Sequence, residues 1–220
     1  MTTQGSVRVE ARRAQTRRAI LDSAWQLAAD SGLDALSLRE IAASVGMQAP
    51  SLYSYFASKA AILDDLFSDG YRAFGEHLAA VGTQLPPKAT PKQRLQELFR
   101  AWIVFCQADQ ARYRLLFTNA VPGWQPSPAA YASSLAVQEQ LCGFLELAGI
   151  TDPDDLDLCT ALSAGLVAQQ MANDPEGDRW LRRVDDVVDM FLLHLAARSR
   201  RAARLAKGTK RSSGRSTSLP

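Results

Sequence analysis

The sequence predicts an all-α protein with about nine helices. Apolar residues recur at spacings of three and four, and Ser, Thr or Asp caps, prolines and glycines separate these runs. No segment alternates between polar and apolar residues for long enough to be a strand. With 220 residues, 47% of them hydrophobic, the chain can bury one large or two small cores.

The first helix is predicted over about 12–31, ending at Gly32. Its apolar stripe consists of Ile20, Ala24, Leu27 and Ala28. Residues 1–11 are expected to form a basic flexible N-terminus. Four arginines at the start of this helix can reach a nucleic-acid backbone, and they are Arg12, Arg13, Arg17 and Arg18.

Residues 37–56 predict two short helices joined by a tight turn. Ser37 and Glu40 form a capping box at the start of the first, and Gly46 ends it. The second is expected over about 48–55, with Pro50 in its first turn. Two short helices with a tight glycine-containing turn form a helix-turn-helix, which presents its second helix to the major groove of DNA.

The outward residues of the second helix suit base edges because they are short or carry an amide. Gln48 can bond adenine in a bidentate way, Ala49 can meet a thymine methyl, and Ser51 can donate or accept. Groups within reach of phosphates surround them, namely Ser37, Arg39, Tyr53, Ser54, Tyr55 and Lys59. The alternative from periodicity alone is a plain three-helix core with surface tyrosines.

The stretch S-L-R-E-I-A-A-S-V-G-M-Q-A-P-S-L-Y-S-Y-F-A-S-K-A-A-I-L resembles the DNA-binding signature of the TetR family of transcriptional regulators. The resemblance spans roughly Arg13 to Leu66. It implies a two-fold dimer that reads the half-sites of a palindromic operator. It also implies phosphate contacts from Tyr53, Tyr55 and Lys59, and a base-facing surface made of Gln48, Ala49, Pro50 and Ser51. Pro50 is a departure, since many members have Gly, Lys or Thr there.

Further helices follow from caps and breakers along the chain. A fourth helix is expected from Ser58 to about Val81, with Gly70 and Gly75 inside it. The starts of the later helices are marked by Thr90-Pro91, Arg112, Ser127-Pro128, Asp152-Pro153 and Asp178. The sequence thus predicts a helix-turn-helix domain over 12–59 and a helical ligand-binding and dimerisation domain over 60–202.

Aromatic and amide side chains in the middle helices could line an apolar cavity for a small-molecule inducer, which we expect to be largely apolar. Each one alone is more often core than ligand contact. The candidates are Phe99, Trp102, Phe105, Tyr113, Phe117, Trp124, Tyr131, Gln138, Gln169 and Gln170.

The last two helices carry a wide apolar face that could pack against a second copy as a four-helix dimer interface. The alternative is that these residues belong only to the core of one chain. The candidates are Leu162, Leu166, Trp180, Val184, Val187, Val188, Phe191 and Leu195.

Charge is unevenly placed, because both ends are basic and the middle is acidic. Residues 1–18 carry a net charge of +4 and residues 201–220 carry +6, so 19–200 carry −8 of the formal total of +2. This pattern points to a polyanion at the ends, or alternatively to solvated tails. Residues 203–220 are expected to be a basic disordered tail.

Other function classes find little support in the sequence. The two histidines have no nucleophile or carboxylate at a catalytic spacing, so no enzyme, cofactor or metal site is expected. Cys106, Cys142 and Cys159 are expected to be reduced core thiols, with a redox sensor as the alternative. No apolar run is long enough to span a membrane, and we expect a cytoplasmic protein.

The sequence therefore predicts a ligand-responsive repressor that binds double-stranded DNA as a homodimer. The alternatives are a DNA-binding regulator controlled by a protein partner, and an architectural DNA-binding protein with no inducer.

Overall fold

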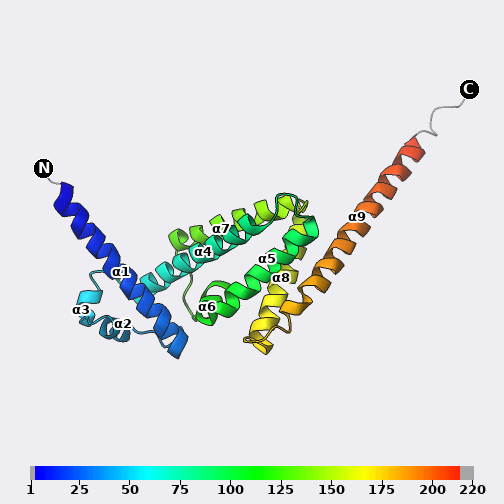
Figure 1. The fold of residues 1–220 in the computed structure, drawn as a ribbon. Helices are drawn as coiled ribbons and strands as arrows, with labels where there is room; N and C mark the ends of the chain where they lie inside the picture. Colours follow the sequence, from blue (N-terminus) through cyan, green and yellow to red (C-terminus); the bar gives the residue numbers. More distant parts are fainter. Residues whose placement is uncertain (1–2, 214–220) are drawn as a thin grey trace, which may run out of the picture. The chain divides into compact units, whose positions relative to one another are not determined.

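The computed structural model describes residues 3–213, and in that range it contains nine α-helices, one 3-10 helix and no strand (Figure 1). The predicted all-α class is confirmed. The chain forms two compact units, one of Met1–Gln84 with Val104–Gly143 and one of Leu85–Ile103 with Phe144–Pro220. One boundary between them follows Gln84, and the other two fall inside α5 (Pro91–Ala108) and α7 (Pro128–Leu147).

The first unit begins with α1 (Thr3–Ser31), α2 (Leu38–Ser44) and α3 (Ala49–Leu52). Their shared core consists of side chains that are at most 1% exposed, namely Ile20, Ala24, Ile41, Ala42, Leu52 and Phe56. These are the periodic apolar positions of three amphipathic segments, so burial of this stripe is what folds the short helices together.

The long helix α4 (Lys59–Gln84) continues the first unit and packs against α6 (Gln110–Phe117) and α7. Gly70 and Gly75 do not interrupt α4, because they lie where neighbouring helices approach closely. A Cβ atom at Gly70 would lie 2.9 Å from a methyl carbon of Leu116, and one at Gly75 would lie 3.2 Å from Val137. A larger residue at Gly70 would therefore force the Leu116 side chain to shift.

The second unit is built from the first part of α5, α8 (Pro153–Asn173), the 3-10 helix η1 (Leu181–Arg183) and α9 (Val184–Ser213). Lys92 and Arg100 of α5 form ion pairs with Asp189 and Asp185 of α9. The side chain of Gln170 is fully buried, and its Oε1 accepts hydrogen bonds from the backbone N–H groups of Trp180 and Leu181 at 2.9 and 3.1 Å. This amide holds the turn between α8 and α9.

Both ends of the chain are more helical than predicted. α1 begins at Thr3 instead of about residue 12, and α9 continues to Ser213 instead of ending near 202. Neither extension contains a proline, so a helix that has already formed in the neighbouring residues can propagate through each of them. The flexible N-terminus and disordered tail are thus wrong within the described range, and residues 1–2 and 214–220 lie outside it.

Candidate nucleic-acid interface

The recognition helix is shorter than predicted. Only Ala49–Leu52 is α-helical, and turns carry the chain through Tyr55. Gln48 occupies the N-cap position, where its carbonyl accepts from the N–H of Ser51 at 2.9 Å, and the carbonyl of Leu52 accepts from Tyr55 at 2.8 Å. Since Leu52 and Phe56 are buried, they fix which side of this segment faces outward.

The outward side carries the predicted base-facing residues. Gln48, Pro50 and Ser51 are exposed, whereas Ala49 is half-buried. The exposed Gln48 side chain makes no capping hydrogen bond at the start of α3. The segment therefore presents one amide, one hydroxyl and little bulk, which suits close approach to base edges. The individual base contacts stay predictions.

The helix before it is fixed by the predicted capping box. Ser37 Oγ accepts from the backbone N–H of Glu40 at 3.2 Å and donates to the Glu40 carboxylate at 2.7 Å. The turn that follows uses Gly46 at a positive φ of 68°, and the N–H of Met47 donates to the carbonyl of Ala42 at 2.8 Å. Local interactions thus determine how α3 leaves α2.

Two arginines of α1 hold the carboxyl end of the recognition segment. Arg13 donates from Nη2 to the carbonyl of Ser54 at 2.6 Å, and Arg17 donates from Nη1 to the carbonyl of Tyr55 at 2.7 Å. Each guanidinium also lies near an aromatic ring, Arg13 over Tyr55 at 5.4 Å and Arg17 over Phe56 at 4.1 Å. Carbonyls that lack a helical partner are satisfied by cations in this way.

Arg17 is therefore used inside the domain. Its Nε and Nη2 also donate to the Asp65 carboxylate of α4 at 2.9 and 2.5 Å. The structure gives this predicted phosphate contact an internal role, which makes it a positioning residue here. The consecutive residues Arg17 and Arg18 of α1 thus pair with Asp65 and Asp69, which lie one turn apart on α4.

The remaining predicted phosphate contacts lie around the recognition segment. Tyr53 is 55% exposed, Tyr55 is half-buried, and Arg39 and Ser54 are exposed. Lys59 is half-buried and donates to the backbone carbonyl of Asp34 at 2.9 Å. Tyrosine, serine and arginine at the edge of a protruding helix are suited to phosphate oxygens, and these contacts stay predictions.

A buried carboxylate joins α1 to α4 one turn further along. Asp69 is 7% exposed and accepts from Arg18 at 2.5 Å, from the Trp25 indole at 3.2 Å and from Arg72. Burial opposes ionisation of Asp69, but hydrogen bonds from Arg18 and Trp25 and the charges of Arg18 and Arg72 outweigh it and lower its pKa. The helix that precedes the recognition pair is thus anchored to α4 by an ionised group.

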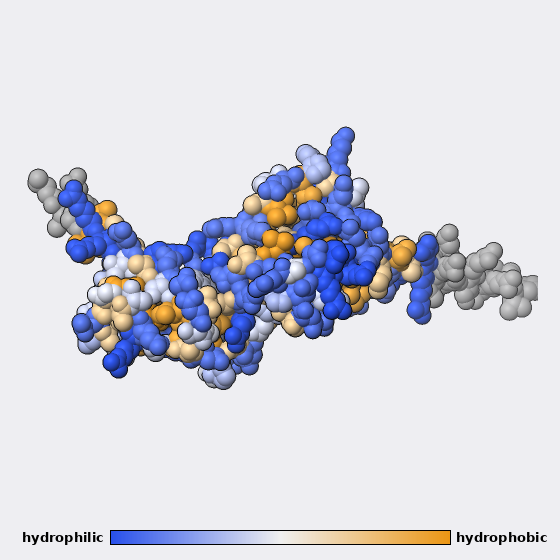
Figure 2. All heavy atoms as spheres, turned by 60° about the horizontal axis from the view of Figure 1, so that its bottom comes forward, coloured by the Kyte–Doolittle hydropathy of each residue, from blue (hydrophilic) through white to orange (hydrophobic). Residues whose placement is uncertain are grey.

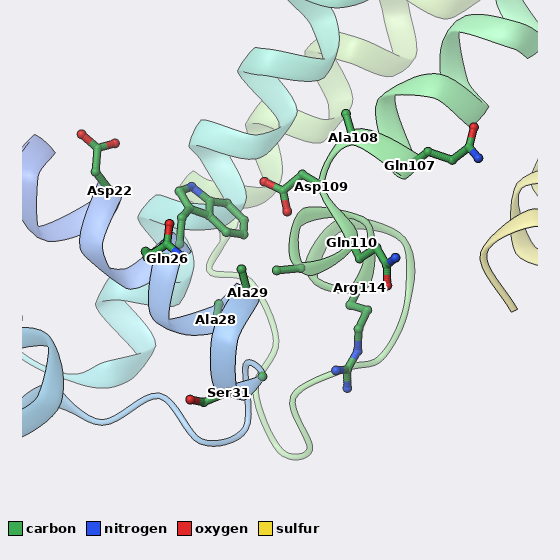
Figure 3. A pocket seen from close by; sticks show the side chains of 13 residues that line it. Asp22, Gln26, Ala28, Ala29, Ser31, Gln107, Ala108, Asp109, Gln110 and Arg114 are labelled. Atoms are coloured by element: carbon green, nitrogen blue, oxygen red, sulfur yellow. The ribbon is translucent and has the colours of Figure 1, made fainter. Parts of the chain in front are cut away.

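A polar cleft of about 880 Å³ lies between the end of α1 and the start of α6 (Figure 3). Asp109 points toward α1 from the junction of α5 and α6, and it caps α6 by accepting from the N–H of Arg112 at 2.8 Å. The Arg112 guanidinium lies 4.9 Å from the Trp25 ring. This cleft contains none of the residues predicted to line a ligand pocket.

A smaller pocket of about 360 Å³ is lined by Phe67, 115–121 and 124–126. We call it the aromatic pocket. It contains Phe117 and Trp124 of the predicted set, together with Phe67, which the sequence analysis missed. Trp124 meets Phe67 edge to face, with ring centroids 5.8 Å apart. Phe67 lies one turn from Tyr71 on α4, and this aromatic i, i+4 pair was the available signal.

The other predicted pocket residues lie elsewhere. Tyr131, Gln138 and Gln169 are exposed, and Gln170 is used in the α8–α9 turn, so these four do not line an internal cavity of the single chain. Phe99 is a core residue of the second unit at 1% exposure, and Phe105 packs on Phe74 in the first unit with ring centroids 4.8 Å apart. Trp102 and Tyr113 are half-buried. Aromatic periodicity alone did not separate core from cavity.

Half of the predicted dimer residues are buried within the single chain. Leu166, Val184, Val188 and Phe191 are at most 6% exposed, so they form the core of their own unit and this part of the prediction is wrong. Leu162, Trp180, Val187 and Leu195 remain half-exposed. The opposite face of α9 carries Met190 and Leu193, which are 65% and 67% exposed.

Comparison with known proteins agrees with the motif. The family model for bacterial regulatory proteins of the tetR family matches residues 20–66. The probable HTH-type transcriptional regulator YttP of Bacillus subtilis (strain 168) is 29% identical over 84 residues, which are 38% of this chain. The match spans 41% of that relative's length.

Solved structures share the fold over most of the chain. A regulatory protein designated SCO4313 has a TM-score of 0.64 at 25% identity, covering 83% of this chain and 98% of its own. The regulator FadR from Bacillus subtilis, in complex with stearoyl-CoA, has a TM-score of 0.59 at 17% identity. The match covers 79% of this chain and 96% of the FadR chain. None of the described helices is long and apolar enough to cross a membrane.

The exposed recognition segment, the capped helix before it, the matching family model and the shared fold agree. Residues 20–66 are thus the helix-turn-helix domain of the TetR family of bacterial regulatory proteins, which makes the protein a DNA-binding regulator of transcription.

Proposed function

We propose that the protein is a repressor that binds a palindromic operator as a homodimer and is released by a largely apolar small molecule. The observation that carries the proposal is the recognition segment, whose outward side chains are polar and short and whose carboxyl end is held by Arg13 and Arg17. A rigidly held short helix can place Gln48 and Ser51 at base edges without losing freedom on binding.

An exposed apolar stripe on α8 supports a homodimer. Leu158, Ala161, Gly165, Ala168 and Ala172 are all exposed and are spaced by three and four residues, so they share one side of the helix. A Cβ atom at Gly165 would meet nothing within 4 Å. A stripe of small apolar residues allows close helix packing, and a second copy related by two-fold symmetry would cover it.

Other surface features agree with an interface in this part of the chain. Met190 and Leu193 of α9 are exposed in the same unit. On the face drawn in Figure 2, apolar atoms are exposed in several separate patches among hydrophilic ones. Recognition helices duplicated by symmetry would then read half-sites about 34 Å apart, which is one turn of B-DNA.

An apolar effector is supported by the aromatic residues of the first unit and by one structural relative. FadR from Bacillus subtilis was solved with stearoyl-CoA, which shows that this fold can hold a ligand with a large apolar part in that protein. A ligand that prefers the state that does not bind DNA would weaken operator binding by its differential affinity. We place this action in the bacterial cytoplasm, where operator DNA is found.

The direct test is to select DNA duplexes that the full chain binds from a random pool. Apolar compounds are then screened for release of the protein from the selected DNA. We expect a palindromic sequence bound with at least about a thousandfold preference over random DNA, as is usual for specific regulators. Binding of random and selected DNA with equal affinity would contradict the proposal and favour an architectural protein. Specific binding that no apolar compound reverses would favour control by a protein partner.

A further inference from the structure

We propose that the aromatic pocket is the effector site, that it takes a flat uncharged ring compound, and that Asp64 and Asp65 transmit its occupancy to the recognition helix. The inference rests on the proposed function and adds the site, the ligand class and the connecting residues. Every contact in the argument lies within the first compact unit.

The chemistry of the pocket wall defines the ligand class. The residues that line it include Phe67, Phe117 and Trp124, and none of its lining residues is charged. Tyr71, which stacks on Phe67 at 4.8 Å, donates its hydroxyl to the carbonyl of Leu116 at 3.1 Å. Burial raises the pKa of Tyr71 to about 12, so its phenol stays neutral. An ionised ligand would find no counter-charge here.

The size of the pocket restricts the ligand further. A volume of about 360 Å³ lies near the lower end of the range for small-molecule sites. Aromatic walls favour edge and offset stacking with a planar partner. The amides of Asn119 and Gln125 and the hydroxyl of Thr118 supply hydrogen bonds at the wall. A compound of two or three fused rings with one polar substituent meets these conditions.

Asp64 holds one wall of the pocket. Its Oδ1 accepts from the Trp124 indole at 3.3 Å and from the backbone N–H of Ser127 at 3.2 Å. These two bonds tie the segment between α6 and α7 to the first turns of α4. In this proposal, a ring compound that stacks in the pocket displaces the Trp124 ring, and this displacement breaks or redirects its hydrogen bond to Asp64.

Asp65 is the next residue on α4 and holds the recognition segment. It accepts two hydrogen bonds from Arg17, and the third guanidinium nitrogen of Arg17 donates to the carbonyl of Tyr55 at 2.7 Å. The Arg17 and Asp65 side chains are 40% and 32% exposed, so this ion pair adds little to the stability of the fold. Its role is to orient the Arg17 guanidinium toward the Tyr55 carbonyl. Consecutive residues on one helix are rigidly connected, so a displaced turn of α4 moves both contacts together.

The result is a continuous chain of contacts from Trp124 through Asp64, Asp65 and Arg17 to the end of α3. Its links are hydrogen bonds, except for the covalent connection between the consecutive residues Asp64 and Asp65, and the Arg17–Asp65 ion pair is partly exposed to solvent. An effector that binds more tightly to one arrangement of these contacts than to another would shift the equilibrium between them.

The first experiment measures operator affinity without any ligand, using the operator obtained by selection. Asp65→Asn should weaken operator binding at least tenfold, because Arg17 loses the charged partner that holds its guanidinium against the Tyr55 carbonyl. Glu76→Gln is the matched control, since it changes a 68% exposed carboxylate on the same helix that is also paired with an arginine. Circular dichroism of both variants separates this effect from loss of folding.

The second experiment uses N-phenyl-1-naphthylamine, an uncharged fluorescent ring compound, as the probe. It should bind the wild-type chain saturably, quench Trp124, and weaken operator binding by about five- to 150-fold. In Asp64→Asn the probe-induced weakening should fall below twofold, relative to that variant's own affinity without probe. Thr118→Phe, which fills the pocket from its rim, should reduce probe binding at least tenfold.

The outcomes separate the two proposals. An operator bound equally well by wild type and Asp65→Asn would overturn the connection to the recognition helix while leaving the proposed function intact. Probe binding that Thr118→Phe and Phe117→Ala both leave unchanged would overturn the site. Failure of the wild-type chain to select any sequence would overturn the proposed function, and this inference with it.

Discussion

The recognition segment and the exposed stripe of α8 are both open surfaces of short side chains, but they are built in opposite ways. The recognition segment exposes amide and hydroxyl groups, and the backbone carbonyls at its carboxyl end accept hydrogen bonds from two arginines. The α8 stripe exposes Ala, Gly and Leu. Short polar groups fit a hydrated polyanion, whereas short apolar groups fit a dry protein surface.

The difference shows how side-chain size and polarity act separately. Small size permits close approach in both places, and polarity decides what approaches. The aromatic pocket is a third case, with large apolar groups turned inward. The following substitutions test these assignments, beginning with the largest expected effect.

The α8 stripe should no longer support a dimer when a charged residue is placed in it. Gly165→Glu should produce a monomer and weaken operator binding at least about 100-fold, because the second recognition helix no longer binds in the same complex. Light scattering and DNA titration measure the two effects. Gly143→Glu is the matched control, since Gly143 is another exposed helical glycine with open space around it. If the Gly165→Glu protein were still a dimer, α8 would not be part of the interface.

The anchor between α1 and α4 should be sensitive to loss of its buried charge. Asp69→Asn should lower the free energy of unfolding by about 2–3 kcal/mol at neutral pH, since Arg18, Trp25 and Arg72 lose a charged acceptor. Urea unfolding measures this change. Glu76→Gln, at an exposed carboxylate of α4, should cost less than about 0.5 kcal/mol.

The pH dependence follows from the lowered pKa of Asp69. Its stabilising contribution is complete above the unfolded value near 3.8 and is lost as the pH falls through the lower folded pKa. The wild type should therefore lose more stability than Asp69→Asn when the pH is lowered through this range. Equal acid sensitivity of the two proteins would show that Asp69 is not ionised in the folded state.

The base-facing surface should lose both affinity and selectivity when its amide is removed. Gln48→Ala should cost about 1–3 kcal/mol on the selected operator and relax the preference at one base pair of each half-site. Competition with single-base variants of the operator measures this. Gln138→Ala removes an exposed amide from α7 and should change neither property. Uniform weakening on all sequences would reassign Gln48 to the phosphate backbone.

A substitution where α4 and α6 approach closely should have the smallest effect on the free energy of unfolding. Gly70→Ala should cost about 1 kcal/mol, because the new methyl would meet the flexible end of Leu116 at 2.9 Å. Gly165→Ala, in open space on α8, should instead stabilise by about 0.5–1 kcal/mol. Thermal unfolding compares the two, and a stabilised Gly70→Ala would show that α6 moves away without cost.

The sequence predicted best where short-range interactions decide the structure. The capping box at Ser37, the turn at Gly46 and the inward pair Leu52 and Phe56 each depend on residues within a few positions, and the structure contains all of them. The helix ends at Thr3 and Ser213 were missed for a related reason. Neither end has the periodic apolar stripe that predicts a helix, but each continues a helix that is already formed in the adjacent residues.

Contacts between distant segments could not be predicted in the same way. Val188 and Phe191 lie on an apolar stripe that looks the same whether it packs within the chain or against a copy. Gln170 resembles a ligand contact until the turn that surrounds it is known. In the pocket wall, Phe67 contacts Trp124, which is 57 positions further along the sequence. No local sequence pattern shows that two such distant residues are in contact.

The brevity of α3 has a consequence for how the regulator finds its target. A single helical turn reads about four base pairs, and a sequence that short recurs by chance about every few hundred base pairs of a genome. Two copies at a fixed spacing read about eight, which recur only about once in several tens of thousands. Most of the regulator's specificity for a rare operator would therefore come from the fixed spacing between two recognition helices, each of which reads a short sequence.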